Sequence, residues 1–200
     1  MFKLDNSKKL YPLWAMLIGL ISFLISGIII GLISLITSEG LILILGVPIG
    51  SLLMLFVLHK LDKSNLLAVV IRSELGGFIG FFMGFMIGEL LGGVVAFFFP
   101  SLSDMTQIKL QIMPNIVVLI VANAIFGASL ADLFYGRKSI CFFALVCGIV
   151  SIPFGLLLSI PIDIAWISFD QNLLFIVTSF GTTTGLSIGL YSLLKLGNKS

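Results

Sequence analysis

Five glycines recur at strict four-residue intervals inside the apolar run GGFIGFFMGFMIGELLGG; they are Gly76, Gly80, Gly84, Gly88 and Gly92. In water each glycine would cost a helix roughly 1 kcal/mol relative to alanine. In a bilayer an apolar run of this length is helical all the same, because every backbone polar group must be satisfied within the segment. The glycines then form a flat strip on which a neighbouring helix can pack backbone to backbone. The run therefore predicts a close-packed membrane helix with glycine-zipper packing.

The composition extends this prediction to the whole chain. Of its 200 residues, 59% are hydrophobic and only 10% are charged, and the mean hydropathy is +1.24, which excludes an ordinary soluble domain. A membrane span needs about 20 apolar residues, and six stretches qualify or nearly qualify, at about 12–37, 41–58, 75–99, 115–135, 139–160 and 172–196. We expect an all-α polytopic membrane protein with six transmembrane helices, in which residues 1–200 form a single integral membrane domain.

The basic residues predict the orientation in the membrane. Under the six-span topology, one side carries Lys3, Lys8, Lys9, Lys60, Lys63, Arg72, Arg137, Lys138, Lys195 and Lys199, and only Lys109 lies on the other side. The positive-inside rule then places both termini in the cytoplasm, and we expect a plasma membrane location. The net charge of +2 gives no indication of nucleic-acid binding.

An internal repeat is a further prediction. Sliding the chain by 105 residues aligns units of about 10–99 and 115–198, and six glycines and a proline then match, among them Gly76, Gly80 and Gly84 with Gly181, Gly185 and Gly189. With 21 glycines in the chain, about one glycine match is expected by chance. Units of three spans would be inverted relative to each other, as in many secondary transporters. The alternative, two unrelated glycine-rich spans, stays open.

Two prolines occupy corresponding places in the proposed units. Pro48 lies in GVPIGSLL and Pro153 in SIPFGLLL, each near the middle of a span. A proline removes one helical hydrogen bond and clashes with the preceding turn, so we expect a helix break at both. Matched interrupted helices indicate a transport site, although a proline can also simply kink a membrane helix.

Polar side chains at membrane depth are the candidate site residues. Glu89, Asn123 and the hydroxyls of Thr182, Thr183 and Thr184 are expected in one layer slightly outward of the membrane midplane. A carboxylate there is costly unless it is protonated, paired or facing water. The functional interpretation is a small polar site that binds a solute, a cation or a proton. The structural alternative is a set of interhelical hydrogen bonds that hold the bundle together.

Enzyme chemistry finds no support in the sequence. No histidine lies within a span, and the motifs HExxH and GxxxxGK[ST] are absent. A membrane aspartyl pair would need two acids at one depth, and Asp132 lies well inward of Glu89. We therefore expect no catalytic residue, no metal site and no cofactor.

Two functions remain. The first is a small transporter or membrane solute-binding subunit with a polar site around Glu89. In size and span count the chain is similar to the substrate-binding subunits of energy-coupling-factor vitamin transporters, with no motif in common. The second is a non-catalytic accessory, assembly or immunity protein that packs against partner helices through its glycine strips. Either protein would be embedded in the lipid bilayer, as a homo-oligomer or in a larger membrane complex.

Overall fold

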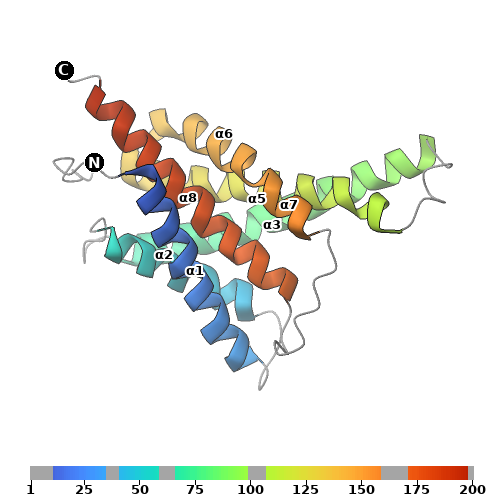
Figure 1. Cartoon of the computed structure of the whole chain (residues 1–200), viewed down its shortest axis with the longest axis horizontal. Helices are drawn as coiled ribbons and strands as arrows, with labels where there is room; N and C mark the ends of the chain where they lie inside the picture. Colours follow the sequence, from blue (N-terminus) through green and yellow to red (C-terminus); the bar gives the residue numbers. More distant parts are fainter. Residues whose placement is uncertain (1–10, 35–40, 59–65, 99–106, 159–170, 198–200) are drawn as a thin grey trace.

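The computed structural model describes residues 11–34, 41–58, 66–98, 107–158 and 171–197 (Figure 1). These segments are helical, and none of the described residues forms a β-strand. The elements in chain order are α1 (Pro12–Ser34), α2 (Leu41–Val57), α3 (Leu66–Phe98), α5 (Gln107–Tyr135), the 3-10 turn η2 (Arg137–Ser139), α6 (Ile140–Val150), α7 (Ile152–Leu158) and α8 (Gln171–Gly197).

Within the described residues, five stretches are long and apolar enough to cross a membrane, which indicates an integral membrane protein. They are Pro12–Ile33, Leu66–Val94, Pro114–Tyr135, Arg137–Leu158 and Asn172–Lys195. Helix α2 has 17 residues and is therefore about 26 Å long at 1.5 Å per residue. This is slightly less than the hydrocarbon thickness of about 30 Å. The all-α class is thus confirmed, with five clear candidate spans and one shorter apolar helix.

Two helices begin earlier than the sequence predicts. Helix α3 starts at Leu66 instead of residue 75, and α5 starts at Gln107 instead of residue 115. The added residues of α3 begin with the apolar stretch LLAVVI, which can stay helical in or near lipid. The charge that follows is paired, since a guanidinium nitrogen of Arg72 lies 3.3 Å from a carboxylate oxygen of Asp132.

The glycine strip of α3 packs against α5. Gly76, Gly80, Gly84 and Gly88 face, in turn, the backbone at Phe126, Ala122, Val118 and Pro114. A Cβ atom on Gly80 would lie only 2.7 Å from the carbonyl oxygen of Ala122. Residue numbers increase along α3 where those of the contacting residues in α5 decrease, so the two helices are antiparallel. Gly92, at the end of the strip, would place a Cβ 3.1 Å from the ring of Pro114.

A second strip joins α8 to α1 in the same way. Gly181, Gly185 and Gly189 of α8 face the backbone at Gly19, Ala15 and Pro12 of α1. The two helices lie side by side and run in opposite directions (Figure 1). The strips of the third and sixth spans, which the proposed repeat makes equivalent, do not pack on each other. Helix α5 covers the strip of α3, and α1 covers the strip of α8. Each of these antiparallel neighbours contacts its strip through backbone atoms at successive turns.

The two prolines have different effects on their helices. Helix α2 continues through Pro48, so the expected break is absent there. Pro48 is buried, and Ser26 of α1 donates a 2.7 Å hydrogen bond to the carbonyl of Gly46; neighbouring helices and serine hydroxyls let a membrane helix tolerate proline. Near Pro153 the helix assignment is interrupted at Ser151, between α6 and α7.

Helix α8 lies at the centre and joins the two glycine-packed pairs. Its ring of Phe180 stacks on Phe126 of α5 with centroids 4.7 Å apart. Phe126 in turn meets Phe23 of α1 edge to face at 6.0 Å. All three rings are fully buried, so they form an aromatic core between α1, α5 and α8.

Replacing Gly84 by leucine is expected to destabilise the α3/α5 pair. A Cβ at Gly84 would lie 2.5 Å from the carbonyl oxygen of Val118, and overpacking of this kind costs about 1–3 kcal/mol or more. The matched control is Gly93→Leu, because nothing lies within 4 Å of a Cβ there. Thermal unfolding in detergent should show a lower midpoint for Gly84→Leu only. Equal midpoints for the two variants would contradict backbone packing at Gly84.

Candidate functional site

A buried amide connects α5 to α8 at the candidate site. Asn123 donates from Nδ2 to the hydroxyl of Ser179 at 3.0 Å and to its own helix at the carbonyl of Leu119, also at 3.0 Å. Thr183 donates from Oγ1 to Asn123 Oδ1 at 2.7 Å. All three polar side chains, Asn123, Ser179 and Thr183, have 0% of their surface exposed. Both ends of the amide are therefore satisfied without water.

The network continues to α6 through a thiol. Cys147 Sγ lies 3.2 Å from the hydroxyl of Ser187, and the Ser187 hydroxyl also lies 2.8 Å from the backbone carbonyl oxygen of Thr183. A Cβ on Gly127 of α5 would collide with this sulfur, so the glycine leaves the room that Cys147 occupies. The polar network thus joins three helices, α5, α6 and α8.

Thr182 and Thr184, the other two predicted threonines, differ from Thr183. The hydroxyl of Thr182 donates to the carbonyl of Thr178 in its own helix, at 2.9 Å. Thr184 is fully buried, and its Oγ1 makes no regular hydrogen bond within the described part of the chain. A buried hydroxyl left unpaired costs roughly 1–3 kcal/mol, which makes Thr184 the least satisfied member of the set.

Glu89 lies apart from this network. Its neighbours Gly88 and Gly92 face α5, whereas Glu89 is on the exposed side of α3. The antiparallel pairing places Asn123 opposite Ile79 and Gly80. Glu89 is therefore about ten residues, or roughly 15 Å, farther along α3. The predicted common layer does not form, because α3 starts at Leu66 and not at residue 75, which moves the middle of the helix away from Glu89.

Sequence reasoning missed three members of the network, Ser179, Ser187 and Cys147. A signal for the serines was present, since Ser179, Thr183 and Ser187 are spaced by four residues and so share a helix face. This row is offset by two residues from Gly181, Gly185 and Gly189, which is a rotation of about 200°. One side of α8 therefore packs on α1 through glycine, and the opposite side carries the hydroxyls.

Comparison with known proteins does not add an assignment. No protein-family model, curated protein or solved structure matches this chain. The chemistry of the network is that of amide, hydroxyl and thiol groups, which bind through uncharged oxygen, nitrogen and sulfur atoms. Such a set suits a small polar solute or a weakly bound cation, and equally suits hydrogen bonds between helices.

Replacing Thr183 by valine is expected to destabilise the bundle, because Asn123 Oδ1 would lose the hydroxyl that donates to it. Interhelical hydrogen bonds in membranes average about 0.6 kcal/mol and reach about 1.7 kcal/mol. Because the Asn123 amide makes two such bonds, we expect the free energy of unfolding to fall by an amount near the upper value. Thr182→Val is the control, since the Thr182 hydroxyl bonds within its own helix. The stability of both variants, Thr183→Val and Thr182→Val, is measured as the midpoint of unfolding in mixed micelles. A Thr182→Val variant as unstable as Thr183→Val would contradict the special role of the network.

Proposed function

We propose that the chain is a six-span membrane transporter or solute-binding subunit whose polar site is centred on Asn123, Thr183 and Thr184. One observation carries this proposal: a polar network joins three helices in the bundle interior, and the buried hydroxyl of Thr184, next to Thr183 in the chain, has no hydrogen-bond partner among the described residues. A small solute or ion bound among these groups would supply the missing partner. Neither catalysis nor a cofactor is part of the proposal.

The packing of the helix pairs supports two inverted three-span units. In the α3/α5 pair, Gly80 lies over Ala122. Shifting Gly80 forward and Ala122 back by 105 residues gives Gly185 and Leu17. Gly185 lies over Ala15 in the α1/α8 pair, two residues from that expectation. The agreement favours a repeat in which each unit carries one glycine strip that packs on a helix of the other unit, the plan on which many transporters alternate between two open states.

The ends of the helices support the proposed topology. Arg72 at the start of α3 pairs with Asp132 near the end of α5. The rings of Tyr135, at the end of α5, and Tyr191, near the end of α8, lie 4.7 Å apart. The basic residues Arg137 and Lys195 follow these tyrosines, so they belong to the same side. This clustering favours cytoplasmic termini in the plasma membrane, with α2 as the sixth and shortest span.

The interrupted helix α6/α7 is the element best placed to move. Ser151 lies one turn after Cys147, and Pro153 cannot donate a backbone hydrogen bond. The backbone N–H of Ser151 shares the carbonyls of Cys147 and Gly148, at 3.1 and 3.3 Å. Movement at this point would open the network to one side of the membrane.

Cys147 is a built-in reporter of such opening. In a Cys141→Ser protein, Cys147 is the only cysteine of the chain. We expect a hydrophilic, membrane-impermeant thiol reagent to label it in native membranes, because transport must expose the network to water. The control is Val177→Cys in a protein without the native cysteines, since Val177 is equally buried and lies outside the network. Labelling of Cys147 only after denaturation, as for the control, would contradict transport.

A second candidate, an accessory membrane subunit, is favoured by the outer face of α3. Its glycines are covered by α5, but Phe78, Phe82 and Phe85 are each about half exposed or more. Glu89 shares this face and makes no hydrogen bond or ion pair with any described residue. A partner helix that supplies a lysine, arginine or amide donor would complement it.

A photo-crosslinking residue at Phe85 tests the second candidate. If a partner helix covers this face, a cross-linked product should form in native membranes and should weaken when Glu89 is replaced by leucine. A cross-linker at Trp14, exposed on α1, is the control. A product of twice the chain mass would indicate a second copy as the partner. Equal products at Phe85 and Trp14, unaffected by Glu89→Leu, would contradict the docking face.

A further inference from the structure

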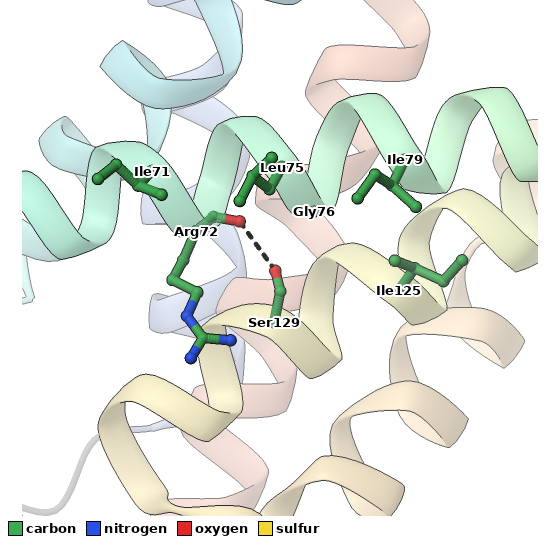
Figure 2. A pocket seen from close by; sticks show the side chains of 7 residues that line it. All are labelled: Ile71, Arg72, Leu75, Gly76, Ile79, Ile125 and Ser129. Atoms are coloured by element: carbon green, nitrogen blue, oxygen red, sulfur yellow. Dashed lines mark hydrogen bonds between the residues drawn. The ribbon is translucent and has the colours of Figure 1, made fainter.

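A pocket of about 270 Å³ lies on the outer surface between α3 and α5. Figure 2 shows its lining: Ile71, Leu75 and Ile79 form a row along α3, and Ile125 stands opposite on α5. Gly76 and Ser129, between these side chains, are too small to fill the space. Ile71 and Ile79 are eight positions apart, so the row is roughly 12 Å long. In a bilayer, the acyl chain of a lipid can enter an apolar surface groove of this shape.

A cation closes one end of this pocket. Arg72 lies at the end away from Ile79 and Ile125 (Figure 2), and about half of its side chain is exposed. The hydroxyl of Ser129 lies between the carbonyl oxygens of Phe126 at 2.8 Å and Arg72 at 3.1 Å, and so links α5 to the backbone of Arg72. A guanidinium has five N–H donors arranged as a fork, and the contact with Asp132 engages one nitrogen. Donors therefore remain for a phosphate.

We infer that this pocket is a binding site for an anionic phospholipid. An acyl chain lies along the isoleucines and Leu75, and the phosphate meets Arg72 at the membrane boundary. The charge decides the occupant, since an apolar groove alone would accept any lipid, whereas a cation at its interfacial end selects an anionic headgroup. The inference depends on membrane embedding and not on transport.

Asp132 makes the inference sharply testable. Its carboxylate lies 3.3 Å from the Arg72 guanidinium and therefore competes with a lipid phosphate for the same cation. Removing this competitor should strengthen lipid binding, although it also removes an ion pair within the protein. A purely structural ion pair predicts no such gain.

The test compares lipids retained by the purified full chain. The protein is equilibrated with nanodiscs that contain equal amounts of phosphatidylglycerol and phosphatidylcholine, and native mass spectrometry gives the ratio of the two lipids on the extracted protein. Wild-type protein should favour phosphatidylglycerol. Arg72→Gln should lower the ratio about fivefold, the factor that corresponds to about 1 kcal/mol for one basic residue near an anionic surface. Arg137→Gln is the matched control, since Arg137 is exposed and outside the pocket.

Two further variants keep the result decisive if Arg72→Gln folds poorly. Asp132→Asn should raise the ratio above that of the wild type. Ile125→Trp should fill the pocket and reduce retention of both lipids without altering the charge. Equal losses in Arg72→Gln and Arg137→Gln would overturn the inference, because they would show general surface attraction. A ratio for Asp132→Asn at or below the wild-type value, or full lipid retention in Ile125→Trp, would overturn it as well.

Discussion

Close backbone contact between antiparallel helices is the interaction on which the rest of this structure depends. Lipid chains are as apolar as leucine, so association of helices in a bilayer relies on packing and hydrogen bonds instead of a hydrophobic driving force. Glycine supplies that packing twice, in α3 against α5 and in α8 against α1. A single added methyl group at most of these glycines would meet backbone atoms. Backbone packing alone therefore defines the two helix pairs, and polar side chains are not needed to form them.

Helix α8 shows how packing and the candidate site are coupled. Its glycine face fits α1, and its opposite face carries Ser179, Thr183 and Ser187 toward α5 and α6. The aromatic contacts of Phe180 fill the space between the pairs. A displacement of α8 would therefore alter both the packing on α1 and the hydrogen bonds of Asn123. This coupling suits a moving transport site, and it also suits a rigid scaffold that presents α3 to a partner.

The sequence predicted the helical class and five of the long apolar helices, because these depend on hydropathy, and it predicted which glycines could lie close to a neighbouring helix, because that depends on local spacing. It also predicted that Asn123 and Thr183 belong to one polar layer. It failed for Glu89, since the depth of a residue depends on where its helix begins, and α3 begins at Leu66 whereas the predicted span begins at residue 75. It failed for Pro48, which is buried, because a membrane helix with supporting neighbours tolerates proline.

The sequence by itself determined which faces of the helices could approach closely, since only small residues allow backbone contact. Tertiary structure alone decided which helix occupies each strip: α5 covers the glycines of α3, and α1 covers those of α8. A flat strip fits any partner of suitable direction, so spacing cannot name it. The same holds for the polar residues. Their types were visible in the chain, but rotation and register of the packed helices placed Asn123 inside the bundle and Glu89 on its surface.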